Sequence, residues 1–304
     1  YVSSKSFRGE AEHRMTGAVG QKRVPTAYLK ECQIPVAPPD QQKHIISEID
    51  KQFSRLDEAV ASLKHAQANL KRYKAAVLKA AVEGKLVVDG HDVTGRKWVS
   101  KPIDMAIASM EQGWSPQCEN EPSRRPDIWG VIKTTAVQSL CYLEFENKRL
   151  PPKFKPRTNL ELASGDLLVT RAGPRVRVGV TCLVKATRPR LILCDKVYRL
   201  RIKPDIANPA FLELVLNAPH IVDELDRLKT GISDSGVNLT QKRFRELMIP
   251  LPSLEEQQQI VAEVERHLSV VVAMGKEVTA SLQRAERLRS SMLASAFHGK
   301  LVAD

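Results

Sequence analysis

The feature that most constrains the fold is a segment of 54 residues that occurs twice. Residues 34–87 and 249–302 align at a constant offset of 215 without a gap, and 13 of the 54 aligned positions are identical. The first copy begins IPVAPPDQQ, the second begins IPLPSLEEQQQIV, and both end in GKLV. A repeat of this length indicates a duplicated structural unit. We therefore expect two copies of one element, with other material before and between them.

Each copy has the pattern of one long helix. In the first copy a Pro-rich start leads to an acidic, Gln-rich turn with Asp40, and neither Pro nor Gly recurs before Gly84. Apolar residues then follow in steps of four and three, which is a heptad pattern. At about 1.5 Å per residue each helix would be roughly 65 Å long. A helix inside a globular core rarely sustains this length, so we predict that the two copies pair along a seam comprising Phe53, Leu56, Val60, Leu63 and Leu70 with Leu268, Val271, Val278, Leu282 and Leu288.

Residues 88–250 have a different pattern, in which short apolar runs alternate with turns. The runs at 130–132, 165–170, 179–184, 191–193 and 197–202 read as strands. Residues 209–216 and 221–228 read as short helices, and a Pro at the first helical position explains Asn208-Pro209. We predict an α+β domain of mostly antiparallel strands.

The positive charge is concentrated in this middle domain. The chain carries a formal net charge of +12, yet residues 124–203 alone hold 18 basic and 6 acidic residues. The remaining residues hold 29 of each sign. A localised basic surplus is typical of a polyanion-binding domain, nucleic acid above all, whereas a generally basic surface would spread the charge.

Several residues of the basic segment suit contact with DNA. Two arginines share one face of a predicted strand, and three surround a Gly-Pro turn; arginine suits bidentate contact with guanine or phosphate. A single loop arginine is about as often a solvated charge. Arg124, Arg125 and the loop 148–157 are expected to steer the DNA backbone rather than to read bases. The predicted DNA-binding residues are Ser115, Lys133, Thr134, Thr135, Arg171, Arg175, Arg177, Lys196, Arg199 and Arg201.

Other classes of protein find little support in the sequence. There is no GxxxxGK[ST] or GxGxxG loop, no HExxH and no GxSxG, so we expect no catalytic residues and no metal site. The five cysteines never form CxxC, which suits reduced thiols in the cytoplasm. No run approaches the roughly 18 apolar residues of a membrane span. The chain begins at Tyr1 without a charged-then-apolar leader, so we expect no signal peptide and a fragment or trimmed form.

Together these motifs resemble the specificity subunits of type I restriction-modification systems. The two repeat segments resemble the family's helical spacers, and Gly113-Trp114-Ser115-Pro116, residues 164–169 and residues 238–240 resemble landmarks of its target recognition domains. The resemblance implies an antiparallel pairing of the helices. It also implies four parts: residues 1–33 as the tail of a first recognition domain, 34–87 as a spacer helix, 88–250 as a complete recognition domain and 251–304 as a second spacer helix.

The resemblance further implies a non-catalytic, cytoplasmic subunit that reads one half of a bipartite site in double-stranded DNA. Its implied partners are methyltransferase subunits, which hold S-adenosylmethionine, and a motor-nuclease subunit; the chain itself would hold no cofactor. Self-association would supply a second recognition domain if the chain is truncated. The alternative is a coiled-coil assembly adaptor whose basic domain binds protein or RNA without reading a sequence.

Overall fold

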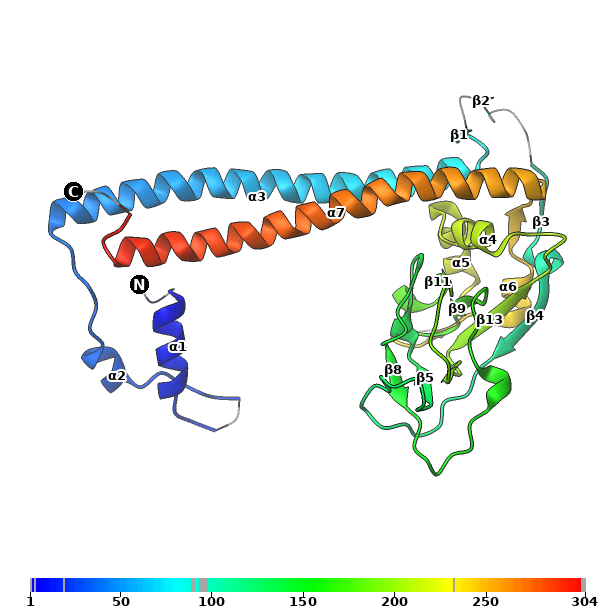
Figure 1. The fold of residues 1–304 in the computed structure, drawn as a ribbon, viewed down its shortest axis with the longest axis horizontal. Helices are drawn as coiled ribbons and strands as arrows, with labels where there is room; N and C mark the ends of the chain where they lie inside the picture. Colours follow the sequence, from blue (N-terminus) through cyan, green and yellow to red (C-terminus); the bar gives the residue numbers. More distant parts are fainter. Residues whose placement is uncertain are drawn as a thin grey trace. The chain divides into compact units, whose positions relative to one another are not determined.

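Figure 1 shows the computed structural model of the chain. It describes residues 2, 4–18, 20–88, 91–92, 98–231 and 233–301, so Val302 at the end of the second repeat lies outside the described residues. The chain divides into two compact units: the first comprises Tyr1–Lys71 and Val270–Asp304, and the second comprises Arg72–Ser269. Each of the two long helices contributes residues to both units.

The repeat forms two helices of equal length. Helix α3 spans Pro39–Val82 and helix α7 spans Leu254–Phe297, each with 44 residues, and both ends keep the offset of 215. Gly84 and Gly299 follow the two helices with φ of +67°. The amide of the next residue then bonds back, from Lys85 to Ala80 (2.8 Å) and from Lys300 to Ser295 (2.9 Å). These are matching C-terminal caps that need a left-handed residue, which explains why both copies carry glycine there.

The helix starts also correspond. Gln42 Nε2 donates to the carbonyl of Ala37 at 2.6 Å, and Gln257 Nε2 donates to the carbonyl of Pro252 at 2.9 Å. Helix α7 has in addition a capping box, in which Ser253 and Glu256 bond to each other's backbone amides. The long helices predicted from the repeat are confirmed.

The two helices run antiparallel. In the first unit the Arg289 guanidinium lies 4.5 Å from the Phe53 ring centroid and bonds to Asp57 at 2.6 Å. In the second unit Tyr73 Oη lies 2.6 Å from His267 Nδ1. Residue numbers thus rise along α3 as they fall along α7, and Figure 1 shows the helices side by side.

The predicted seam is partly buried along most of its length. Nine of its ten residues are less exposed than the surrounding helix surface; these are Phe53, Leu56, Val60, Leu63, Leu70, Leu268, Val271, Val278 and Leu282. Leu288 departs from the prediction because its side chain is 47% exposed. Its neighbour Arg289 takes the contact with Phe53 instead.

The rest of the first unit is formed by two short helices. Helix α1 spans Lys5–Arg14 and begins with a side-chain cap from Ser4, and helix α2 spans Thr26–Glu31. The rings of Phe7 and Tyr28 lie 6.2 Å apart and join the two helices.

The second unit is an α+β domain built on short strands. Its helices are α4 (Pro209–Leu216), α5 (Pro219–Leu228) and α6 (Gln241–Arg245), with 3-10 turns η1 (Ile103–Ala106), η2 (Thr134–Ala136), η3 (Thr158–Leu160) and η4 (Arg175–Arg177). Its strands are β1 (Val87–Val88), β2 (His91–Asp92), β3 (Ser100–Pro102), β4 (Ile107–Gln112), β5 (Gly130–Ile132), β6 (Val137–Gln138), β7 (Cys141–Tyr142), β8 (Asn147–Arg149), β9 (Leu167–Thr170), β10 (Ala172–Gly173), β11 (Thr181–Leu183), β12 (Leu191–Ile192), β13 (Val197–Ile202), β14 (Val237–Asn238) and β15 (Met248–Pro250).

The strand pairing agrees with the prediction. The largest sheet has the order β11-β9-β13-β4, and a second has the order β12-β5-β8. Among the described strands every pair is antiparallel except β12 with β5. Helix α4 begins where expected, because Asn208 Oδ1 accepts from the amide of Ala210 and Pro209 occupies the first position. The predicted α+β fold is confirmed.

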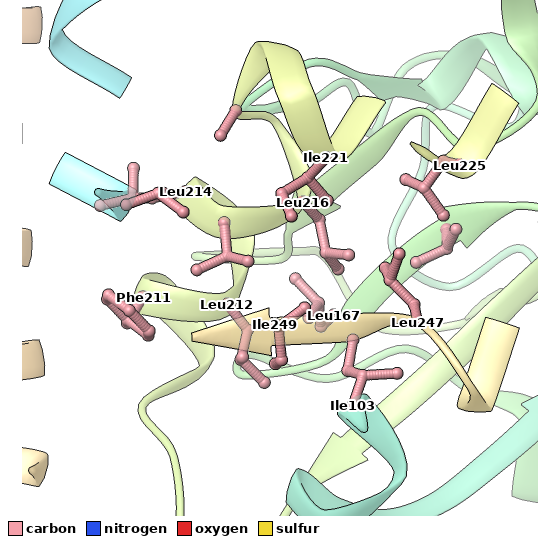
Figure 2. Packing of buried hydrophobic residues seen from close by; sticks show 14 of the residues in the cluster. Ile103, Leu167, Phe211, Leu212, Leu214, Leu216, Ile221, Leu225, Leu247 and Ile249 are labelled. Atoms are coloured by element: carbon pink, nitrogen blue, oxygen red, sulfur yellow. The ribbon is translucent and has the colours of Figure 1, made fainter. Parts of the chain in front are cut away.

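Two hydrophobic clusters enclose the central strands β9 and β13. Leu167 and Leu200 face the first cluster, which includes α4, α5, the last turns of α3 and the first turns of α7. Figure 2 shows part of this cluster, with Leu212 and Ile249 close to Leu167 and Phe211 at its edge. Leu168 and Val197 face the second cluster, around β5 and β12. Because both faces of β13 are covered over its first four residues, this part of the strand forms a rigid centre of the domain.

Candidate nucleic-acid interface

A pocket of about 470 Å³ lies where several loops of the second unit meet, and we refer to it as the basic pocket. It lies beside the start of β13 and the end of β5. Three lysines and one carboxylate face it together with polar and apolar groups. Its lining residues are Ser115, Pro116, Gln117, Cys118, Val131, Ile132, Lys133, Thr134, Lys148, Cys194, Asp195 and Lys196.

A clamped turn forms one wall of the basic pocket. The Val197 amide donates to the Cys194 carbonyl at 3.2 Å, which makes Asp195 and Lys196 the central residues of the turn before β13. Arg171 holds this turn: its amide donates to the Lys196 carbonyl at 2.9 Å, and Nη1 donates to the Asp195 carbonyl at 3.2 Å. The turn is therefore held in one conformation before any ligand arrives.

Ser115 fixes the carboxylate of the same turn. Its hydroxyl donates to Asp195 Oδ1 at 2.5 Å and accepts from the Asp195 amide at 3.2 Å. The loop that carries Ser115 is anchored in turn, because the Trp114 amide donates to the Leu193 carbonyl at 2.9 Å. Sequence reasoning selected Ser115 and Lys196 but not Asp195, although Asp195 stands beside Lys196 in a turn before a strand.

Lys133 and Thr134 form another wall of the basic pocket, and Thr135 follows them in the chain. Glu146 accepts from Lys133 Nζ at 2.9 Å and from Thr135 Oγ1 at 2.5 Å, and these hydrogen bonds hold the pKa of Glu146 below its usual value. By contrast, Lys148 and Lys196 have no carboxylate partner among the described residues. Within the described part of the chain, two lysines without a salt bridge therefore line the basic pocket together with the carboxylate of Asp195.

Arg177 supports this wall through the hydrogen bonds of its guanidinium. Its Nη2 donates to the carbonyls of Thr134 and Val137, each at 2.7 Å, and Nη1 donates to Gln138 Oε1 at 3.1 Å. Because these groups occupy its guanidinium, Arg177 has a structural role in holding the loop. Its contact with DNA stays a prediction.

The predicted DNA contact of Arg199 is wrong in this structure. Its side chain is 1% exposed and lies among Glu111, Asp166 and two backbone carbonyls. The alternation of β13 does put Arg199 and Arg201 on one face, but the second hydrophobic cluster covers that face at Arg199 and not at Arg201. Strand alternation alone does not reveal which part of a face another layer covers.

Arg175 and Arg201 lie apart from the basic pocket. Arg175 pairs with Asp226 (3.2 Å) and Asp234 (2.8 Å) beside a second hollow under α5. Arg201 is exposed at the far end of β13 from Lys196. The structure thus gathers Ser115, Lys133, Thr134 and Lys196 around one pocket, with Thr135, Arg171 and Arg177 behind its walls.

An aromatic and basic cluster lies on the loop that carries Ser115. The Arg157 guanidinium lies 4.5 Å from the Trp114 ring centroid, and Trp114 meets Phe154 edge to face at 5.9 Å. Lys153 lies 5.2 Å from the Phe154 ring centroid. Such cation–π contacts hold positive charge near the pocket. From the sequence we expected residues 148–157 only to steer the DNA backbone. The contact between Arg157 and Trp114 could not be predicted because it joins segments that are distant in sequence.

Metal clusters and membrane-spanning helices are both absent from the described residues. Within the described ranges, no three His, Cys, Asp or Glu side chains group so that they could hold a metal ion. No described helix combines the length and the apolarity required to cross a membrane.

Comparison with known proteins places the chain in a family. Residues 157–284 match the model of the type I restriction modification DNA specificity domain. The EcoEI specificity subunit of Escherichia coli is 30% identical and covers 88% of this chain, and the EcoKI specificity subunit of the same species is 26% identical and covers all of it. The chain belongs to the type I restriction-modification specificity subunits. It spans 59% and 65% of the lengths of these two relatives.

Solved structures agree with this family at the level of the fold. A chain from a study of complex assembly and conformational transition of the type I R-M system superimposes with a TM-score of 0.65 at 20% identity, over 88% of this specificity subunit and 62% of that chain. The HsdS subunit from Thermoanaerobacter tengcongensis gives a TM-score of 0.52 at 19% identity, over 98% and 68%.

Proposed function

We propose that this specificity-subunit chain reads one half of a bipartite site in duplex DNA through the basic pocket, and that it has no catalytic role itself. The observation that supports the proposal most is that two lysines without a salt bridge in the described ranges, Lys148 and Lys196, line one pocket whose turn is held by Arg171. Phosphate contacts require free cations, and base reading requires side chains held in place before binding.

The proposal includes the partners that the family implies. Methyltransferase subunits holding S-adenosylmethionine would dock on the paired helices α3 and α7, and a motor-nuclease subunit would complete the assembly. A cytoplasmic location follows from the proposed DNA substrate. Self-association is also part of the proposal, as a source of a second recognition domain.

Salt-dependent binding tests the DNA interface. The full chain, with its methyltransferase partner, should bind duplex DNA with an affinity that falls steeply as salt rises. Lys148→Ala and Lys196→Ala should each weaken binding and reduce the slope of log affinity against log salt by about 1. Lys242→Ala, exposed on α6 and outside the lining of the basic pocket, is the matched control and should change neither quantity.

Two results would contradict the proposal. Equal binding of random and selected duplexes would exclude reading of bases, and an unchanged salt slope in both pocket variants would exclude the basic pocket as the contact. If the methyltransferase partner is captured while DNA binds nowhere on the complex, the adaptor alternative is correct instead.

A further inference from the structure

One carboxylate stands in the basic pocket among three lysines. Among the described residues that line this pocket, Asp195 is the only acidic one. A carboxylate facing phosphates weakens DNA binding through repulsion, so its position on a proposed DNA surface needs a reason. Either the carboxylate has a purely structural role, or it meets a hydrogen-bond donor on the nucleic acid.

The hydrogen bonds of Asp195 leave part of the carboxylate free. Oδ1 accepts from Ser115, whereas Oδ2 has no donor among the described residues. Ser115 also accepts from the Asp195 amide, and Arg171 bonds to the carbonyls of Asp195 and Lys196. Backbone and carboxylate are thus both fixed, with one oxygen available to a ligand.

We propose that Asp195 is a specificity-determining residue that accepts a hydrogen bond from the exocyclic amino group of a base, either N4 of cytosine or N6 of adenine. This inference rests on the proposed DNA-reading function. In the major groove these amino groups are donors, whereas thymine O4 and guanine O6 are acceptors that a carboxylate repels. Lys196, the next residue in the turn, offers the complementary donor to an acceptor on the same or the neighbouring base pair.

Selection from a randomised duplex library with the full chain tests this inference. Asp195→Asn keeps an oxygen for Ser115 and turns the free position into an amide donor. At one base position the wild type should prefer cytosine or adenine, and Asp195→Asn should lose its preference for the amino group by about 5- to 150-fold. Asp205→Asn, an exposed aspartate after the other end of β13, is the matched control and should select the wild-type sequence.

Base analogues then distinguish the two sources of the amino group. At the selected position 2-pyrimidinone replaces cytosine, or purine replaces adenine, so that only the amino group is lost. The analogue of the base that Asp195 contacts should weaken binding of the wild type and leave Asp195→Asn unaffected. If both analogues bind the wild type as well as the normal bases do, the inference is wrong.

The outcomes separate this inference from the proposed function. A wild type that selects no sequence refutes the DNA-reading function itself. A wild type that selects a sequence which Asp195→Asn selects equally refutes only the role of Asp195. If circular dichroism shows that Asp195→Asn does not fold, Ser115→Ala takes its place: it frees the carboxylate, and discrimination at the same position should fall.

Discussion

Arg199 should be a determinant of stability rather than of DNA binding. Its guanidinium donates to the Glu111 carboxylate and to the carbonyls of Asn159 and Glu161, both at 2.7 Å. It also lies 3.5 Å from Asp166, whose side chain is only 5% exposed. Arg199→Ala leaves that carboxylate without its counter-charge and two carbonyls without a donor.

The stability lost in Arg199→Ala depends on which of the arginine's former partners can be hydrated again. Glu111 is 39% exposed and can be hydrated again, so its loss counts for little. Asp166 keeps the hydrogen bond from the Ala163 amide at 2.9 Å but remains buried. Removing one partner of a buried pair typically costs 3–5 kcal/mol, and we expect about 3 kcal/mol here.

Urea unfolding followed by tryptophan fluorescence measures this loss. All three tryptophans, Trp98, Trp114 and Trp129, belong to the second unit, so their emission reports on the domain that contains Arg199. Arg201→Ala, exposed on the same strand, should stay within about 0.5 kcal/mol of the wild type. A loss below 1 kcal/mol for Arg199→Ala, or a stable variant that no longer binds DNA, would refute the reasoning.

Two further predictions concern the repeat and the thiols. Gln257→Ala should lower the free energy of unfolding by about 1–3 kcal/mol, because this fully buried amide makes three hydrogen bonds. The repeat-matched Gln42→Ala, at an exposed site, should cost less than about 0.5 kcal/mol, and equal losses by circular dichroism would contradict this. Burial raises the pKa of Cys194 to about 12, so at pH 8 iodoacetamide should modify the exposed Cys141 in the native chain and spare Cys194 until urea is added. Mass spectrometry of the two peptides measures both rates, and similar rates would show that Cys194 is accessible.

The fold was predictable to the extent that local pattern determines it. The offset of 215 predicts both long helices, because the same caps begin and end them. The strands 130–132 and 197–202 form as predicted because their apolar residues fill the two clusters. Leu288 was misplaced because a heptad pattern does not show that a neighbouring arginine can cover the partner ring.

The site was predictable only in part. Residue chemistry selected Lys133 and Lys196, which do line one pocket. It also selected Arg199, since nothing local distinguishes an arginine under a second layer from one in solvent. Asp195 was not predicted, because the local sequence does not distinguish it from any other aspartate in a turn. Its partners Ser115 and Arg171 come from distant parts of the chain.

The buried strand β13 and the turn before it should differ in how well they tolerate substitution. A strand packed on both faces tolerates little substitution, since each change of volume creates a cavity or a clash. The two central residues of the turn at its start, Asp195 and Lys196, belong to neither cluster. Substitutions there therefore leave the core intact. Under the proposed function, exchanging a few side chains of this turn would change the DNA target while the buried strand keeps their positions fixed.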